Sequence, residues 1–363
     1  MATAAAVTLV VGAAVWAASV GAGGQENRNQ ARTPGDRGSA STATPLHHRQ
    51  QATSSGGHTR AQPFRAFKAG SWWNTPVPDD VPLDPNGRAV LHYLRTAPQS
   101  GNGCLNLAGT PGSPWGQPIY WAKPSDPAYD VQGVVPRYRP PELDNLRIPV
   151  DARSASNSDG TMTIFDRTAG YVTALTDASY HPRADRWTAS GATVTYLGSN
   201  GLNVLTGRSD NPHNTGSHRG NNAATMAVRW DMVKAGRITH VLKVASGPEL
   251  ANRWVFPLVG SDGGYNGDDP AIPPEGLRLR VKPSVDLAAL HLAPQALVIA
   301  TAMQRYGIYL GDSGVTTAVK LEDTVTEGLG QVWDLKPTDL CALPFTPAYW
   351  EVVREGYDPS RGE

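Results

Sequence analysis

The sequence predicts a mainly β fold: an antiparallel β-sandwich or jelly roll with one helix packed against it. Glycine (38) and proline (30) are abundant, and ten tryptophans are many for 363 residues, a composition typical of turn-rich β proteins. Several short stretches have the period of two that a strand requires, most clearly LRLRVK at 277–282. Only the stretch 294–306 has a strong helical pattern, so one helix is expected beside the sheets.

The first part of the folded region combines aromatic and proline-rich segments. Trp72 and Trp73 precede three prolines, which predicts an irregular segment with its aromatic side chains packed inward. Residues 86–97 have the pattern of a short capped helix. The prolines around 118–123 and 131–138 restrict these extended pieces to edge strands or loops, because proline cannot donate a hydrogen bond to a β-ladder.

A β-hairpin gives the clearest strand signal. The stretches 161–166 and 171–176 alternate small polar and apolar side chains on either side of a turn. The strong helix should begin at Pro294 and stop at Gly307, with its apolar face on the sheet. Further strands are expected at 193–197, 202–205, 237–244, 253–258 and 277–282.

Composition divides the chain into three parts. Residues 1–24 carry no charge and are almost wholly small and apolar, which predicts a signal peptide cleaved after Ala22 or, if it is retained, an N-terminal membrane anchor. Residues 25–62 have scarcely an aliphatic side chain and should form a disordered linker. Residues 63–363 should form a single β-rich catalytic or binding domain. We therefore expect a protein that is secreted, extracellular or attached to the cell envelope.

Charge and cysteine content limit the partners. Thirty-two basic and thirty-two acidic residues balance, which removes the electrostatic case for nucleic acid or an anionic membrane surface as a partner. A neutral polysaccharide or oligosaccharide suits this balance, and a monomer is expected. Cys104 and Cys341 are the only cysteines. In an exported protein, an isolated pair most simply forms a disulfide.

The sequence contains no GxxxxGKS, no GxGxxG after a strand, no HExxH and no GxSxG. The usual signatures of nucleotide binding, zincin proteolysis and α/β-hydrolase chemistry are therefore missing. The richest polar stretch is 208–244, where titratable and amide side chains lie between two apolar runs. Loops of this kind commonly carry chemistry. The candidates for substrate binding are Trp121, His218, Arg219, Asn222 and Trp230.

Five residues are candidates for catalysis. His240 lies on an apolar face of its predicted strand, as a catalytic histidine or as part of a cleft wall. Arg229 and Asp231, two apart on a predicted strand, would point the same way and either face a cleft or form a structural ion pair. Asp166 closes the first hairpin strand and Asp312 follows the helix, and turn geometry is the alternative explanation for both.

No cofactor is expected. A metal bound by His213 and His218, together with Asp210, is the alternative, although loop histidines follow no fixed spacing rule. Glu322 and Asp323 are further carboxylates, and a solvated face is the simplest explanation for them.

Several short motifs occur together between positions 71 and 314. They are WNTP at 73–76, FD at 165–166, NAA at 222–224, RWDMV at 229–233, GRITHVL at 236–242, PEGLRLRVK at 274–282, YG at 306–307 and DSG at 312–314. In this combination the chain resembles a group of secreted bacterial proteins, many from actinomycetes and soil bacteria, that have no assigned activity. The resemblance implies no mechanism. The chain departs from the pattern where Asn222 and Met232 stand in place of acidic residues.

Three functions agree with these features. The first is a glycoside hydrolase that acts on an extracellular or cell-wall polysaccharide with two carboxylates from Asp166, Asp231 and Asp312. The second is a polysaccharide lyase, in which Arg229 neutralises a uronate carboxylate and His240 or a tyrosine removes the adjacent proton. The third is a non-catalytic carbohydrate-binding or envelope protein. We favour the hydrolase because carboxylates outnumber well-placed basic groups.

Overall fold

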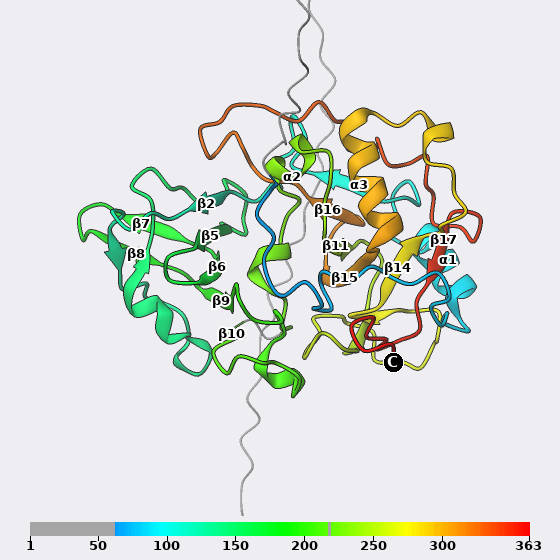
Figure 1. Ribbon diagram of the computed structural model, residues 1–363, viewed down its shortest axis with the longest axis horizontal. Coiled ribbons are helices and arrows are strands. Elements are labelled where there is room, and N and C mark those ends of the chain that lie inside the picture. Colours follow the sequence, from blue (N-terminus) through cyan, green and yellow to red (C-terminus); the bar gives the residue numbers. More distant parts are fainter. Residues whose placement is uncertain (1–61, 217–218) are drawn as a thin grey trace, which may run out of the picture. The chain divides into compact units, whose positions relative to one another are not determined.

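The computed structural model describes residues 62–216 and 219–363 (Figure 1). The predicted export segment, the predicted linker up to position 61 and the candidate His218 lie outside the described residues. All described residues belong to one compact unit, His58–Glu363. Within them, no helix has the length and hydrophobicity needed to span a bilayer.

The predicted class is confirmed: the fold is mainly β, with two larger sheets and few helices. The five-stranded sheet has the order β10-β9-β6-β5-β2. Its strands are β2 (Ile119–Trp121), β5 (Met162–Asp166), β6 (Tyr171–Thr176), β9 (Gly191–Tyr196) and β10 (Thr215–Gly216). The predicted hairpin is present, because β5 and β6 pair antiparallel from Met162 opposite Leu175 to Asp166 opposite Tyr171. The proline-flanked β2 lies at the edge of the sheet, parallel to β5.

The two faces of this sheet differ because successive side chains point to opposite sides. One face buries Ile164, Leu175 and Val194 in an apolar cluster. The other face carries Phe165 and Val172, which pack with Trp72, Trp73 and Tyr309 in a second cluster. Three buried threonines share this second face, namely Thr163, Thr193 and Thr195.

The six-stranded sheet has the order β1-β16-β11-β15-β14-β17. Its strands are β1 (Asn106–Ala108), β11 (Leu242–Ser246), β14 (Arg278–Val281), β15 (Ile308–Ser313), β16 (Ala318–Lys320) and β17 (Trp350–Val352). The pairing is mixed: β1 with β16 and β11 with β15 are parallel, whereas β14 is antiparallel to both of its neighbours. Three two-stranded sheets complete the β structure: β3 (Ala128–Tyr129) with β4 (Leu146–Arg147), β7 (Ser179–His181) with β8 (Arg186–Thr188), and β12 (Ala251–Trp254) with β13 (Pro274–Glu275).

The predicted helix packs on the six-stranded sheet as α3 (Pro294–Arg305) (Figure 1). Ile299 and Met303 are buried in one apolar cluster with Leu279 of β14. The chain must leave the helix at Gly307, where φ is +79° and a Cβ would lie 2.5 Å from the Leu279 carbonyl oxygen. The shorter predicted helix is α1 (Gly87–Thr96), which buries Val90, Leu91 and Leu94.

Three strand predictions are wrong. The strand predicted from 237 begins only at Leu242, because α2 (Trp230–Lys234) precedes it and the chain turns after the helix at Gly236, where φ is +80°. The stretch 202–205 contains a 3-10 turn in place of a strand, since the Asn203 side chain accepts a hydrogen bond from the backbone N–H of Leu205. The strand predicted at 253–258 is misplaced, since β12 spans Ala251–Trp254 and the chain turns at 256–257. The stretch 131–138, expected as an edge strand or a loop, ends in a 3-10 turn at Pro136–Tyr138.

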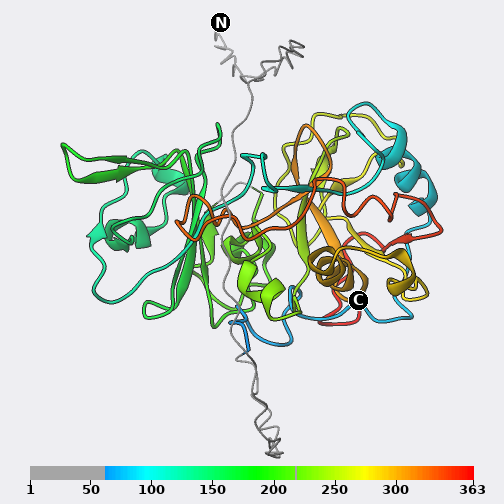
Figure 2. The same ribbon diagram turned by 90° about the horizontal axis from the view of Figure 1, so that it is seen from above.

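The polar stretch predicted to carry function, 208–244, runs through β10 of the five-stranded sheet to the start of β11 in the six-stranded sheet. Figures 1 and 2 both show its yellow-green ribbon, including α2, with the five-stranded sheet on one side and the six-stranded sheet on the other. Trp72 and Trp73 are buried in the same region, as the sequence predicts, and each packs edge-on against Tyr309 of β15. Aromatic packing therefore joins the two sheets beside the polar stretch.

The predicted disulfide is present between Cys104 and Cys341, which are 237 positions apart in the sequence. Replacing both cysteines by alanine should lower the free energy of unfolding by up to about 5 kcal/mol, because the bridge restricts the unfolded chain. Urea denaturation of both proteins measures this difference. A reductant should destabilise the native protein and leave the double variant unchanged, whereas equal stability of the two proteins would contradict the prediction.

Candidate active site

Arg229 is the centre of the contacts among the N-terminal segment, the five-stranded sheet and α2. It is only 2% exposed, and its Nε and Nη2 donate to the two carboxylate oxygens of Asp231 at 2.9 and 2.6 Å. Nη2 also donates to the Phe64 carbonyl oxygen at 2.8 Å. The guanidinium lies 5.1 Å from the ring centroid of Trp121 and 5.4 Å from that of Phe165. Arg229 therefore links the N-terminal segment, the five-stranded sheet and α2.

Arg229 and Asp231 do not lie on a strand, which corrects the sequence prediction. Arg229 precedes the first residue of α2 and Asp231 lies in its first turn. The segment is held by Val228, whose N–H donates to the Lys320 carbonyl at 2.8 Å and whose carbonyl accepts from the Glu322 N–H at 2.9 Å. This pairing brings the start of α2 against the chain that continues from β16.

Glu322 and Glu327, here called the glutamate pair, face each other beside Arg229. The Glu322 carboxylate accepts a hydrogen bond from the backbone N–H of Trp230, and Glu327 accepts one from the N–H of Ile119 at 2.7 Å. A further hydrogen bond joins the two carboxyl groups. Glu322 is 7% exposed, so the prediction that it lies on a solvated face is wrong.

The glutamate pair retains a proton at neutral pH. Burial raises the pKa of Glu327 to about 9, and the adjacent Glu322 carboxylate adds to the shift. Burial also raises the pKa of Glu322, with a smaller contribution from the charge of Asp231. Two carboxyl groups in contact cannot both ionise easily, so one proton is shared between them.

The surroundings of the glutamate pair are partly aromatic and partly open to solvent. The Trp230 ring packs edge-on against Trp333 at 5.4 Å, and the Trp333 indole N–H donates to the Glu322 carbonyl at 2.7 Å. The Asp231 side chain is 45% exposed, whereas Trp121 and Glu327 are partly exposed. The site thus combines a protonated carboxyl pair, an ion-paired carboxylate and aromatic rings.

His240 is buried near Arg229 and Asp231, and it does not lie within a strand. It is 6% exposed, and its Nδ1 lies 2.8 Å from the Val241 carbonyl oxygen. Burial, with a smaller contribution from the charge of Arg229, lowers the pKa of His240 to about 4. The imidazole is therefore neutral at pH 7, and Nδ1 carries the proton that it donates to the carbonyl.

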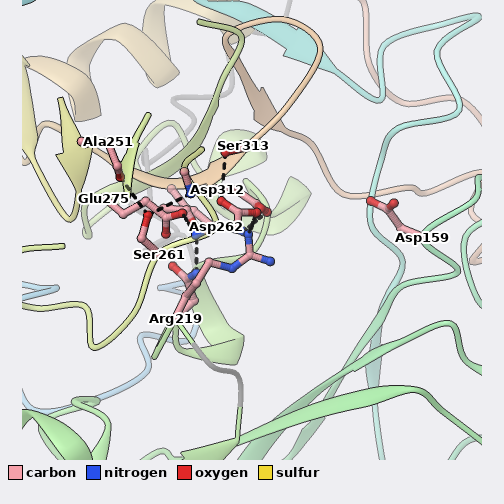
Figure 3. Close-up of polar contacts among 12 residues, drawn as sticks. Asp159, Arg219, Ala251, Ser261, Asp262, Glu275, Asp312 and Ser313 are labelled. Atoms are coloured by element: carbon pink, nitrogen blue, oxygen red, sulfur yellow. Dashed lines mark hydrogen bonds and ion pairs between the residues drawn. The ribbon is translucent and has the colours of Figure 1, made fainter. Parts of the chain in front are cut away.

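A second group of charges crosses neighbouring strands of the six-stranded sheet (Figure 3). Lys243 on β11 donates to Asp312 on β15 at 2.7 Å. Arg219 donates to the carboxylates of both Asp312 and Asp262, and the Ser313 hydroxyl donates to Asp262 at 2.9 Å. Burial opposes ionisation of Asp312, but the charges of Lys243 and Arg219 prevail and lower its pKa well below the usual range. We call Arg219, Lys243, Asp262 and Asp312 the charged network.

Glu275 lies beneath the charged network and is fully buried. Its Oε1 accepts a hydrogen bond from the backbone N–H of Asp262 at 3.0 Å, while Oε2 accepts none from the described residues. Burial, together with a side-chain hydrogen bond to Asp262, raises the pKa of Glu275 to about 9. The same hydrogen bond and the charge of Arg219 outweigh the burial of Asp262 and lower its pKa. Glu275 is the protonated partner of an ionised aspartate.

The remaining candidates lie away from these groups. Asp166 is buried and accepts hydrogen bonds from the N–H groups of Thr168 and Ala169 and from Arg147 at 2.7 Å, so it closes the hairpin turn. Asn222 is buried and caps a 3-10 turn by accepting from the N–H of Thr225 at 3.0 Å. In the ranges 62–216 and 219–363, no three side chains of the metal-binding types are grouped to hold an ion.

The sequence predicts Arg229, Asp231 and Trp121 as site residues but gives no sign of Glu327. The position of Glu327 beside these residues depends on long-range packing. One local signal for Glu322 exists. Residues 318–322 are extended, with Val319 and Leu321 in the apolar core, so Lys320 and Glu322 must share the opposite face.

Comparisons with known proteins give no match. This holds for models of protein families, for curated proteins and for solved structures. The candidate site is therefore defined by its own geometry.

The protonation of Glu275 should be visible in the pH dependence of stability. Its pKa rises from 4.5 in an ordinary environment to about 9 in the folded protein. The folded state therefore keeps a proton that the unfolded state loses, and stability should fall as pH rises from 4.5 to 9, by at most about 1.4 kcal/mol per pH unit.

Glu275→Gln should remove this part of the slope, because glutamine is neutral at every pH and can still donate to Asp262. Denaturation curves of the native protein and the variant at several pH values measure the difference. Glu249→Gln, at an exposed glutamate, serves as the control. Parallel slopes for the native protein and Glu275→Gln would show that Glu275 is ionised in the folded protein.

Proposed function

We propose that the protein is a secreted glycoside hydrolase that acts on an extracellular or cell-wall polysaccharide. One arrangement supports this proposal: two glutamates, with the pKa of Glu327 raised by burial to about 9, lie near the ion-paired carboxylate of Asp231. Hydrolysis of a glycosidic bond needs one carboxyl group that is protonated and a second that is ionised. Environments that separate the pKa values of neighbouring acids are how enzymes assign these two roles.

Glu327 is the proposed general acid. It is partly exposed and protonated at neutral pH, and the Ile119 N–H fixes one of its oxygens. After Glu327 transfers its proton to the leaving-group oxygen, Glu322 remains hydrogen-bonded to the Trp230 N–H. The repulsion between two carboxylates then favours the return of a proton to Glu327.

Asp231 is the proposed base or nucleophile. Its carboxylate is the most exposed of the acidic groups in this site, and the bidentate contact with buried Arg229 fixes its orientation. Trp121, Trp230 and Phe64 are partly exposed rings around Arg229 and the glutamate pair. Such rings can stack on the apolar face of a sugar.

The lyase alternative has less support. The guanidinium of Arg229 is committed to Asp231 and Phe64, so it is not free to neutralise a uronate at the bond that breaks. His240 is a weak base because burial lowers its pKa to about 4.

A panel of neutral and uronate-bearing polysaccharides tests the proposal. New reducing ends without absorbance from unsaturated uronates are expected from a hydrolase. Reducing ends together with that absorbance would indicate a lyase. Retention in an affinity gel without any cleavage would indicate a carbohydrate-binding protein, which is the remaining alternative.

Glu327→Gln should lower kcat by about a hundred-fold to ten-thousand-fold, because glutamine cannot donate the proton. Activity of the native enzyme should fall on the alkaline side as pH rises past about 9, where Glu327 loses its proton. Asp80→Asn, at an exposed aspartate, should leave activity unchanged. Thermal unfolding confirms that each variant is folded. Full activity of a folded Glu327→Gln variant would remove Glu327 from the mechanism.

A further inference from the structure

Lys320 connects the glutamate pair to the charged network. Residues 318–322 are extended, so Lys320 and Glu322 project from the same face, about 7 Å apart along the chain. Lys320 lies on β16, next to β11 with Lys243, which in turn lies next to β15 with Asp312. Its ammonium group is close enough to both Lys243 and Asp312 to influence their ionisation. Cationic groups thus extend away from the proposed catalytic acids.

The charges of Lys320 and the charged network do not balance unless a residue outside the six-stranded sheet contributes a negative charge. The cations are Lys320, Lys243 and Arg219. The ionised acids of the charged network are Asp262 and Asp312. Glu275 is not counted because it is protonated. Three positive and two negative charges leave one positive charge.

Asp159 supplies the missing negative charge from outside the six-stranded sheet. It precedes β5 of the five-stranded sheet and lies 3.2 Å from the Lys320 ammonium group. Figure 3 shows Asp159 on a different segment of the chain from Asp262 and Asp312. Its carbonyl accepts from the Asp177 N–H at 2.7 Å, and its N–H donates to the Asn157 side chain at 3.0 Å. The backbone is held, so only the carboxylate has freedom to move.

The pair of Lys320 and Asp159 is the one that a ligand can open. The Asp159 side chain is 44% exposed and the Lys320 side chain 20%, and a single contact joins them. A partly exposed pair with a single contact contributes little to stability. In contrast, the Lys243 side chain is 10% exposed and Asp312 has two cationic partners. A carboxylate from solvent can therefore replace Asp159 at Lys320 without disturbing the charged network.

We propose that Lys320 forms a subsite for a carboxylate-bearing sugar, with Asp159 occupying the carboxylate position when no ligand is bound. The polymer would then carry an acidic sugar close to the bond that is cleaved. This inference rests on the proposed function, since it places the subsite beside the glutamate pair. It also refines the expectation of a neutral polysaccharide, which rests on net charge alone and does not detect three cations gathered by the fold.

Titration calorimetry of the folded protein with glucuronic acid, glucose and acetate tests the subsite directly. Glucuronic acid should bind more tightly than either glucose or acetate. Asp159→Asn should strengthen glucuronic acid binding up to about five-fold, because it removes a competing carboxylate. Lys320→Gln should weaken binding by about ten-fold or more, because it removes a charge-assisted hydrogen bond.

Lys68 and Asp210 form a matched control. They are also an exposed lysine–aspartate pair, with a distance of 2.6 Å. Lys68→Gln and Asp210→Asn should leave glucuronic acid binding unchanged. The same affinity in the native protein, Asp159→Asn and Lys320→Gln would overturn the subsite, and so would binding of acetate or glucose as tight as that of glucuronic acid.

Hydrolysis plays no part in this measurement, so the two proposals can fail separately. Glu327→Gln should bind glucuronic acid like the native protein even though it cannot transfer a proton. If glucuronic acid binds as expected but no polymer is cleaved, the subsite stands and the hydrolase proposal fails. If neutral polymers are cleaved but glucuronic acid does not bind, the hydrolase proposal stands and the subsite fails.

Discussion

The contacts of the buried Arg229 guanidinium hold the N-terminal segment, α2 and the five-stranded sheet together, and the candidate site depends on them. A charge at 2% exposure is costly unless its hydrogen bonds are satisfied. Here Asp231, the Phe64 carbonyl and two aromatic rings surround it. These partners come from the N-terminal segment, α2 and two strands of the five-stranded sheet. Arg229 can therefore be buried only when all of these parts are in place, so folding and assembly of the site are coupled.

The distribution of cations decides which acids ionise. Asp231 forms an ion pair with Arg229. Asp262 and Asp312 both pair with Arg219, and Asp312 also pairs with Lys243. No ion pair to a cation is formed by Glu275, Glu322 or Glu327 among the described residues. Burial without such a partner raises the pKa of a carboxyl group. The two groups of charges thus follow one rule, in which paired acids are ionised and unpaired buried acids keep a proton.

Local sequence patterns predicted the elements whose shape depends on near neighbours. The hairpin of β5 and β6, the helix α3 and the inward-facing Trp72 and Trp73 were predicted correctly, because alternation, Pro294 and aromatic content act locally. The strand expected around His240 was wrong. Its apolar residues resemble a strand, but α2 ends just before them and the chain joins the sheet only at Leu242.

The site was predicted only in part, because most of its contacts join residues that are distant in the sequence. Arg229 and Asp231 are close in sequence, and their ion pair was one of two alternatives that their spacing suggested. The partners of Glu327 are distant: Ile119 lies 208 positions away. Glu275 shows no local sign of burial beside a charge, since its environment depends on Asp262 and Arg219. Composition also hid the gathering of lysine and arginine, because the fold brings together cations that are scattered in the sequence.

Buried carboxyl groups of this protein should hold protons at neutral pH. Infrared spectroscopy of protein with isotope-labelled glutamate detects such protons directly, through the carbonyl band of the protonated acid. At neutral pH the native protein should show this band, Glu275→Gln should retain part of it, and the triple variant Glu275→Gln/Glu322→Gln/Glu327→Gln should lose it. A native spectrum with only ionised glutamate at neutral pH would contradict the account, because neither the proposed general acid nor the partner of Asp262 would carry its proton.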